Sequence, residues 1–319
     1  MSDERIDEKT GLFLAKSIAS TETDARRFRR KTRDGRGRRI RRGVSMSVDH
    51  WAQLTPRQKY LVEIRAVIET RVQRPVVSHQ SAAALWGLPV VGAWPASVHI
   101  LVRPESHARS KNGVIAHREQ FLVNDDVVEF DGMLVTSPAR TVLDLARTAN
   151  FTDAVVALDH ALNPKRAAPW VLMSVDMLWS GLERTSSARG RAKATRAIRF
   201  AKPNADNAGE SLSRVVIFEL GFPDPVLQTR HNNPRGGYYY TDFEWPEFRL
   251  IGELDGRDKY LKEEYLRGRT PGQAVVEEKV REDHLRAEGN QFARWGTTDL
   301  RPRQSLFRIL TNAGLPTIR

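Results

Sequence analysis

Two short stretches of alternating hydrophobic and polar residues stand out in the last third of the chain. Residues 238–245 are rich in aromatic side chains and alternate as a half-buried β-strand does. Residues 250–255 form a second run, which Gly256 ends. Pro246 lies between the runs and favours a turn, because proline has a fixed φ and cannot donate to a strand ladder. The pattern predicts a β-hairpin with a loop of about four residues.

The pattern around this hairpin predicts a domain of helices and strands. Residues 202–207 are typical of a linker, so we place a boundary there and assign residues 206–319 to one α/β domain. The predicted order is helix, three strands, helix, strand and a terminal helix. In residue numbers, these are a helix over 210–220, a strand beginning at 225–228, the hairpin, a helix over 274–288, a strand over 291–295 and a helix over 303–312.

Residues 51–165 carry the pattern of a separate α+β domain. Apolar residues recur at three- and four-residue steps over 51–74, which predicts one helix with Thr55 as its cap and Pro56 in its first turn. Residues 166–205 are predicted to be a helical, basic connector. The other predicted elements are a helix over 78–87, strands over 97–102, 114–117 and 127–135 with a turn at Asp131-Gly132, and helices over 136–147 and 151–162.

Two pairs of polar residues in this middle domain are candidates for chemistry. Ser78 and His79 have no third residue to complete a catalytic triad, so we interpret Ser78 as a helix cap. His99 and His117 are expected on neighbouring strands, but no third metal ligand stands out in the sequence. We therefore interpret both as surface or core histidines.

Two aspartates of the predicted helices also have a structural interpretation. Asp144 and Asp159 are expected to be helix-packing or capping partners of Arg140 rather than catalytic residues. The residues of this domain do not reveal its task.

Composition adds a strong positive charge to this picture. The chain has 51 Lys and Arg against 39 Asp and Glu, a net charge of +12 and a pI near 10.2. Such an excess points to a polyanionic partner, nucleic acid first and an anionic membrane surface second. Residues 26–42 hold eleven Arg or Lys and one acid, a net +10. Phosphate contact and a disordered basic tail are both open interpretations.

Within this basic segment, Gly35 and Gly37 suit a turn, and residues 39–44 are expected to be the last strand of a small wing. A second basic run over 184–202 has seven Arg or Lys and no acid, which fits either a DNA groove or a solvated helix face. The expected partner is DNA. The candidate nucleic-acid-binding residues are Arg29, Arg30, Lys31, Arg38, Arg39, Arg41 and Arg42.

Other classes are excluded by what the sequence lacks. It has no cysteine, which excludes disulfides, cysteine-based zinc sites and thiol catalysis. It has no run of 18 apolar residues, and its first residues are charged without an apolar segment. We therefore expect a cytoplasmic protein without a signal peptide or a membrane partner.

The predicted hairpin concentrates acidic residues on one face. If Trp245 pairs with Leu250, Asp242 lies opposite Glu253, and Asp255 follows on the same face. Three carboxylates at such spacing repel one another, and a bound Mg²⁺ or Mn²⁺ would reverse this. Lys259 follows the strand. A solvated polar face is the alternative, and the apolar opposite face does not decide between the two.

These residues resemble the PD-(D/E)XK nuclease superfamily, and its very-short-patch-repair-like branch in particular. The similar segment is Glu253-Leu254-Asp255-Gly256-Arg257-Asp258-Lys259, within a resemblance over about residues 205–300. Lys259 takes the position where that branch usually has histidine. Asp255 takes the position where the superfamily has lysine, which is a departure from its pattern. The resemblance implies a restriction-endonuclease-like fold, with Glu210 as the acidic residue of the upstream helix.

A second resemblance covers the rest of the chain. Residues 41–44 (RRGV), 78–89 (SHQSAAALWGLP) and 137–146 (SPARTVLDLA) are similar to segments of AbiEi-type antitoxin proteins. This resemblance implies an N-terminal winged-helix DNA-binding segment over residues 1–50. Because no helix-turn-helix is readable in residues 1–30, that segment is expected to be degenerate. A protein partner from a linked operon is implied as well.

These observations leave two main hypotheses. In the first, the chain is a metal-dependent DNA endonuclease in which Asp242 and Glu253 bind Mg²⁺ with the Leu254 carbonyl. Asp255 would touch that ion or a second one, Glu210 would be a direct or outer ligand, and Lys259 would act on the phosphate or the water. In the second, the chain is a non-catalytic, antitoxin-like DNA-binding regulator. A binding partner within an antiphage or toxin–antitoxin locus is a third possibility.

Overall fold

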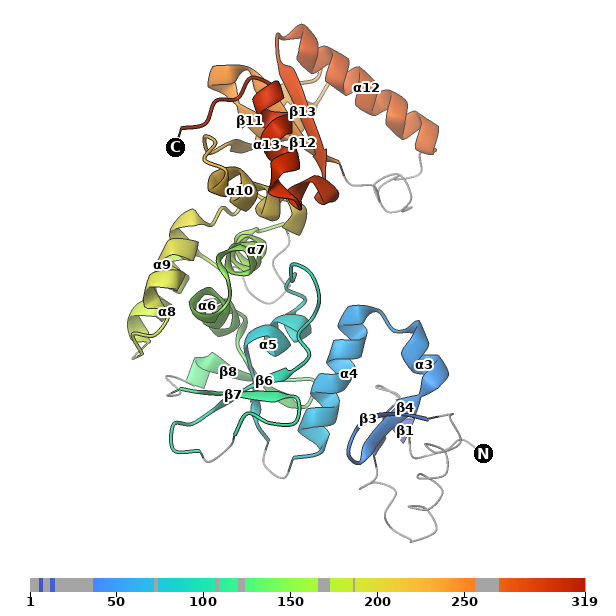
Figure 1. Ribbon diagram of the computed structural model, residues 1–319, viewed down its shortest axis with the longest axis vertical. Coiled ribbons are helices and arrows are strands. Elements are labelled where there is room, and N and C mark those ends of the chain that lie inside the picture. Colours follow the sequence, from blue (N-terminus) through green and yellow to red (C-terminus); the bar gives the residue numbers. More distant parts are fainter. Residues whose placement is uncertain are drawn as a thin grey trace. The chain divides into compact units, whose positions relative to one another are not determined.

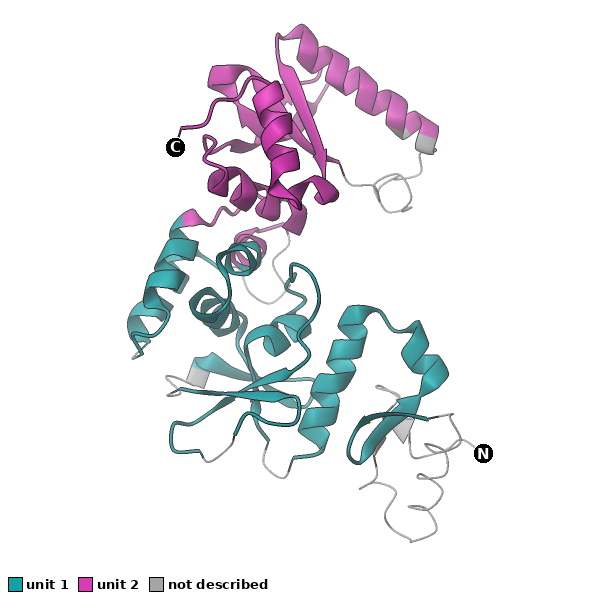
Figure 2. Ribbon diagram, viewed as in Figure 1, with its two compact units in different colours: residues 1–157, 168–199 teal, residues 158–167, 200–319 magenta. Residues whose placement is uncertain are grey.

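The protein is a mixed α+β chain with two compact units, as a computed structural model shows (Figures 1 and 2). Unit 1 comprises Met1–Ala157 and Ala168–Arg199, and unit 2 comprises Leu158–Ala167 and Phe200–Arg319. The described part of the chain contains three sheets, which agrees with the predicted α+β class. The structure describes residues 6–7, 12–14, 37–71, 74–106, 109–119, 124–165, 173–185, 187–255 and 270–318.

Unit 1 begins with a small sheet in the order β1-β2-β4-β3. It is formed by β1 (Ile6–Asp7), β2 (Leu12–Leu14), β3 (Gly37–Arg41) and β4 (Val44–Ser47). The strand expected over residues 39–44 ends earlier than predicted, at Arg41. The chain turns at residues 42–43, where Gly43 has a φ of 82°, so β3 and β4 form a hairpin. Leu12, Val44 and Met46 form its buried core with Val62 and Ala66 of helix α4 (Pro56–Glu69).

The single helix predicted over 51–74 is two helices, α3 (Val48–Gln53) and α4 (Pro56–Glu69). The chain breaks at Leu54 and restarts at Thr55, whose side chain accepts a hydrogen bond from the Gln58 amide in a capping box. The predicted cap and the proline in the first turn are confirmed. The local start signal at Thr55 was stronger than the hydrophobic period that runs through it.

The central sheet of unit 1 has the order β7-β6-β5-β9-β8. The predicted strands are confirmed, with the last one divided by a turn at Asp131 and Gly132, where φ is 50° and 69°. Strand β5, only two residues long, was not predicted. The strands are β5 (Val76–Val77), β6 (Val98–Val102), β7 (Val114–Arg118), β8 (Val127–Phe130) and β9 (Met133–Thr136), and the short 3-10 helix η1 (Asn124–Asp126) precedes β8.

Helix α5 (His79–Trp86) packs against β6 and β9 of this sheet, and α6 (Pro138–Thr148) packs against α5. The helices α7 (Phe151–Leu162), α8 (Val175–Arg184) and α9 (Arg191–Phe200) follow along the chain, and residues 158–162 of α7 and the last residue of α9 are grouped with unit 2. Helix α5 ends at Gly87, which has a left-handed φ of 76°. Helix α8 packs against α6. Residues 168–199, which the sequence set apart within a connector, are therefore grouped with unit 1.

Unit 2 has a four-stranded sheet in the order β10-β11-β12-β13, in which only β12 and β13 run parallel. The predicted order of helix, three strands, helix, strand and terminal helix is confirmed. The elements are α10 (Ala208–Glu219), β10 (Val226–Asn232), β11 (Tyr238–Trp245), η2 (Pro246–Phe248), β12 (Leu250–Asp255), α12 (Pro271–Ala287), β13 (Gln291–Gly296), η4 (Thr297–Leu300) and α13 (Arg303–Asn312).

One face of this sheet forms the core of unit 2. Trp245 pairs with Leu250, as the predicted register requires. Phe243, Trp245 and Leu250 are buried in one cluster with residues of α10 and α13. Gly252 lies under the rings of Trp245 and Trp295, which leave no space for a Cβ atom. This packing holds the acidic residues of β11 and β12 on the opposite face, because side chains alternate along a strand.

None of the helices in the described residues is long and apolar enough to span a bilayer.

Candidate functional site

Four elements of unit 2 bring polar side chains together around Asp242. The β11–β12 ladder pairs Phe243 with Gly252, so the next residues in register are Asp242 and Glu253. Glu210 comes from the first turn of α10, and Gln228 comes from β10. Glu210 is 2% exposed and Glu253 is 5% exposed. Carboxylates this deeply buried require compensation by hydrogen bonds, protons or cations.

Glu210 is held in place by three donors. The Asp206 amide donates to its Oε2 at 2.7 Å, and Gln228 Nε2 donates to the same oxygen at 3.2 Å. The Asn207 side chain donates to Oε1 and also caps the helix by accepting from the Glu210 amide. Burial and the negative charge of Asp242 raise the pKa of Glu210 to about 8. The carboxyl is therefore positioned beside Asp242, with a pKa suited to holding a proton at neutral pH.

Glu253 has one paired and one unpaired oxygen. Its Oε2 contacts Arg281 of α12 at 2.9 Å. Its Oε1 is buried and has no hydrogen-bond partner among the described residues. The pKa of Glu253 is raised to about 7, mainly by burial; Arg281 opposes this rise and the charge of Asp242 contributes to it. A buried oxygen without a donor is costly, so a cation close to this atom would stabilise it.

Asp242 links the two glutamates electrostatically. Its Oδ2 accepts a hydrogen bond from the Leu254 amide at 2.9 Å. Its charge raises the pKa of both Glu210 and Glu253. The structure therefore brings together three of the carboxylates that the sequence singled out.

Asp255 lies at the exposed end of β12, and its side chain is 52% exposed. It contacts Arg294 of β13 at 3.0 Å, and the same guanidinium contacts Glu278 and Glu282 of α12. Asp255 thus belongs to a network of ion pairs at the side of the cluster. Lys259 lies outside the described residues.

Gln228 and Arg281 are functional candidates that the sequence analysis missed. Gln228 has a φ of 53°, a rare value for a residue other than glycine, and its side chain reaches Glu210. Its polar side chain in a strand opposite Asp242 was the available signal. Nothing local identifies Arg281, because its contact with Glu253 depends on how α12 packs against the sheet.

The candidate nucleic-acid-binding residues are only partly within the described chain. Arg29, Arg30 and Lys31 lie outside it. The other four lie on β3 and the turn after it. Among these, Arg38, Arg39 and Arg42 are exposed, whereas Arg41 donates to the Asn112 carbonyl at 2.9 Å.

Three histidines of unit 1 lie close together, and their contacts correct the interpretation of Ser78 as a helix cap. His99 Nδ1 and His117 Nε2 are 2.9 Å apart, so the two residues are neighbours as expected. A third imidazole, His79, stacks on His117 with ring centroids 3.5 Å apart. Ser78 occupies the cap position of α5, but its hydroxyl contacts His79 Nδ1 instead of capping the helix. Within the described ranges, no group of three or more His, Cys, Asp or Glu is arranged to hold a metal ion.

The two helical aspartates have different partners. Asp144 pairs with Arg140 at 2.8 Å, as expected. Asp159 does not pair with Arg140. It accepts two hydrogen bonds from Arg214 of α10, at 2.8 and 3.1 Å, and both side chains are fully buried. Asp159 is therefore a core residue of unit 2.

Part of the chain is similar to a known protein family. Residues 76–199 match the model of the AbiEi antitoxin C-terminal domain. Two curated relatives are uncharacterized proteins of Mycobacterium tuberculosis, from strains CDC 1551 and H37Rv. Each is 29% identical over 175 residues, which is 55% of this chain and 60% of the relative. The match thus spans about three-fifths of the length of these relatives.

Proposed function

We propose that unit 2 is a metal-dependent nuclease domain that hydrolyses phosphodiester bonds in DNA. The observation that carries this proposal is the cluster of Glu210, Asp242 and Glu253, in which both glutamates are buried. The order of elements in unit 2 and the parallel pairing of β12 with β13 are consistent with the nuclease resemblance. The likeness of unit 1 to an antitoxin domain supports a role in a toxin–antitoxin or defence system.

The chemistry of the donors fits a hard divalent cation. Asp242 and Glu253 would hold Mg²⁺ or Mn²⁺ with the Leu254 carbonyl and coordinated water. Among the described residues, no third carboxylate is arranged to join these two as a ligand. The buried Oε1 of Glu253 has no donor among the described residues, and burial raises the pKa of this carboxyl to about 7. A cation beside this oxygen would compensate for the missing donor and would stabilise the ionised carboxylate. When bound, such an ion lowers the pKa of a coordinated water and neutralises charge on the phosphodiester.

The protein groups around the cluster have separate tasks in this proposal. Glu210 is fixed by Asp206, Asn207 and Gln228, so it can accept or return a proton at a defined place. Arg281 holds Glu253 and brings a positive charge to the cluster, where it can attract a phosphate. Lys259, by its position in the sequence, would supply a second cation.

The DNA contacts are assigned to basic residues of unit 1. Arg38, Arg39 and Arg42 are exposed on the β3–β4 hairpin, where phosphate oxygens can reach them. Such contacts position a protein on DNA without reading its sequence.

A second candidate function is a DNA-binding regulator without nuclease activity that has a toxin as its partner. The match of residues 76–199 to an antitoxin domain favours it. The residue at the usual lysine position, Asp255, is engaged with Arg294 and supports the same alternative.

Plasmid cleavage with Mg²⁺ or Mn²⁺ tests the proposal. The parent is compared with Asp242→Ala and Glu253→Ala, and with Glu247→Ala, which removes an exposed carboxylate from the turn before β12. We expect cleavage by the parent and the Glu247 variant, and loss of cleavage in the two site variants and in EDTA. Absence of cleavage by the parent, with DNA binding unchanged in both site variants, would establish the regulator instead.

A further inference from the structure

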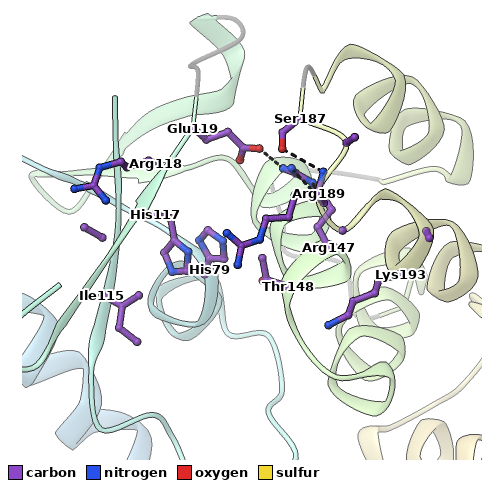
Figure 3. A pocket seen from close by; sticks show the side chains of 14 residues that line it. His79, Ile115, His117, Arg118, Glu119, Arg147, Thr148, Ser187, Arg189 and Lys193 are labelled. Atoms are coloured by element: carbon purple, nitrogen blue, oxygen red, sulfur yellow. Dashed lines mark hydrogen bonds and ion pairs between the residues drawn. The ribbon is translucent and has the colours of Figure 1, made fainter. Parts of the chain in front are cut away.

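Unit 1 contains a pocket of about 800 Å³ that the proposed nuclease function does not use (Figure 3). Its walls come from the start of α5, strand β7, the end of α6 and the segment that leads into α9. A volume of this size falls within the range of small-molecule sites, roughly 300–1,000 Å³. All of these walls belong to unit 1.

The described lining of this pocket is strongly basic. It includes four cationic residues, Arg118, Arg147, Arg189 and Lys193, and one carboxylate, Glu119. Glu119 is already engaged, because it contacts both Arg147 and Arg140. The pocket therefore keeps an excess of positive charge that its own acid does not neutralise.

Two of these cations remain available to a ligand. The side chains of Arg189 and Lys193 are exposed and have no carboxylate partner among the described residues. Arg147, by contrast, donates to the Arg189 carbonyl and holds the segment that carries Arg189 in place. Gly190 follows directly, and a Cβ there would lie 2.3 Å from the Arg147 carbonyl oxygen. The cationic wall is thus fixed against α6 by close backbone packing.

His79 lines the pocket although it is only 2% exposed. Its φ of 51° lies in the left-handed region, which costs a residue other than glycine roughly 1–2 kcal/mol. Its Nδ1 lies 3.0 Å from the Ser78 hydroxyl oxygen. A buried polar side chain on a backbone position with a strained φ is typical of a functional position.

The neighbouring imidazole completes the histidine wall. Figure 3 shows the rings of His79 and His117 side by side, and their centroids are 3.5 Å apart. The pKa of His117 is lowered to about 4, mainly by burial; Glu119 opposes this shift and the charge of Arg189 contributes to it. Burial also lowers the pKa of His79, with His117 adding to the effect. At neutral pH each ring is uncharged and carries one N–H, and the tautomer decides which of its two nitrogens donates.

The first turn of α9 adds a favourable dipole. It carries no acidic residue, and a helix N-terminus attracts negative charge through its unpaired amides. This contribution is secondary to the side chains, but it has the same sign.

We propose that this pocket binds a small molecule that carries a phosphate group. Phosphoryl oxygens would accept from Arg189 and Lys193, and one of them would accept from the ring of His79. The position of His79 separates this ligand from DNA. A small phosphorylated molecule can enter the pocket and reach this buried ring, whereas the backbone of a duplex meets only the exposed rim.

Isothermal titration of the full chain with ATP, pyrophosphate and inorganic phosphate tests the proposal. Arg189→Ala and Lys193→Ala are compared with Arg199→Ala, which removes the same charge from an exposed position of α9 outside the pocket. We expect at least one of the three probes to bind the parent. Each pocket variant should weaken its Kd by about tenfold or more, as loss of a charge-assisted hydrogen bond does. The Arg199 variant should stay within about twofold.

Comparison of the three probes distinguishes a nucleotide from a simple phosphate ligand, and either result supports the site. Failure of all three to bind at millimolar concentration overturns the proposal. An equal loss in the Arg199 variant does so too, because the effect would then be that of overall charge. A third contrary result is DNA binding that weakens in the Arg189 and Lys193 variants as much as probe binding does, since the pocket would then be a DNA contact.

His79→Asn examines the floor of the pocket. Asparagine tolerates the left-handed conformation better than most residues, and it lacks the imidazole ring. We expect weaker probe binding with an unchanged circular dichroism spectrum. Full affinity in this variant would contradict the role of His79. Should it fail to fold, the exposed Lys193 substitution still decides the proposal.

Discussion

Replacing Glu253 with glutamine is expected to change how the stability of unit 2 depends on pH. The substitution keeps the shape of the side chain and removes its charge. In the parent, burial raises the pKa of this carboxyl from an ordinary 4.5 to about 7. A rise of that size corresponds to about 3 kcal/mol, at about 1.4 kcal/mol per pH unit.

The sign follows from which state holds the proton. Below pH 4.5 the carboxyl is protonated in both the folded and the unfolded chain. Between pH 4.5 and about 7 the unfolded chain releases the proton while the folded chain keeps it, so rising pH favours unfolding. The stability present at low pH is lost as the pH rises through about 7. Glu253→Gln lacks this dependence and should be more stable than the parent at pH 8 by about 3 kcal/mol.

Differential scanning calorimetry at pH 5 and pH 8, with EDTA present, measures the effect. For a unit of this size, about 3 kcal/mol corresponds to roughly 10 °C in Tm. Glu247→Gln is the control, because it removes a charge that water solvates in both states. Added Mg²⁺ at pH 8 should raise the Tm of the parent but not that of Glu253→Gln. A difference between parent and variant that is the same at both pH values would refute the reasoning.

Three further predictions concern the cores and the histidines. Gly252→Ala places a Cβ 2.6 Å from the Trp295 ring, so urea titration should show a decrease of roughly 1–3 kcal/mol in the free energy of unfolding. The control Gly296→Ala should not show this decrease. Equal stability of the two variants would contradict the prediction. Asp159→Asn leaves the buried Arg214 without its carboxylate and should lower the free energy of unfolding by about 3–5 kcal/mol, measured by calorimetry. The double variant Asp159→Leu with Arg214→Met should recover most of this stability. An Asp159→Asn variant as stable as the parent would show that the ion pair is not needed. Burial lowers the pKa of His117 from 6.5 to about 4, so the free energy of unfolding of unit 1 should fall as the pH falls from about 6.5 to 4. His117→Gln should reduce this loss of stability in calorimetric scans. An acid dependence that is the same in parent and variant would contradict the prediction.

The order of elements in unit 2 could be predicted because its signals are local. Alternation over 238–245 and 250–255, with Pro246 between them, indicates a hairpin without any knowledge of the rest of the chain. The pairing of Trp245 with Leu250 followed from the length of the turn. From that register the meeting of Asp242 and Glu253 could be anticipated, because the residues are close in sequence.

The features that escaped prediction all depend on contacts between distant residues. Strand β5 has only two residues, too few for a period, and exists because it pairs with both β6 and β9. The partner of Asp159 is Arg214, 55 positions away, rather than Arg140. In the sequence His79 stands out only with its neighbour Ser78. Its stacking on His117 depends on the packing of α5 beside β7.

The sequence alone therefore determined the positive charge, the elements with a clear period, and the acidic pair on neighbouring strands. Only the tertiary structure decided which buried charges are paired, which glutamate oxygen lacks a donor, and which cations and histidines enclose a pocket. The physical reason is that periodicity and turn chemistry act over a few residues. Desolvation and ion pairing depend instead on which side chains the folded backbone brings within a few ångströms.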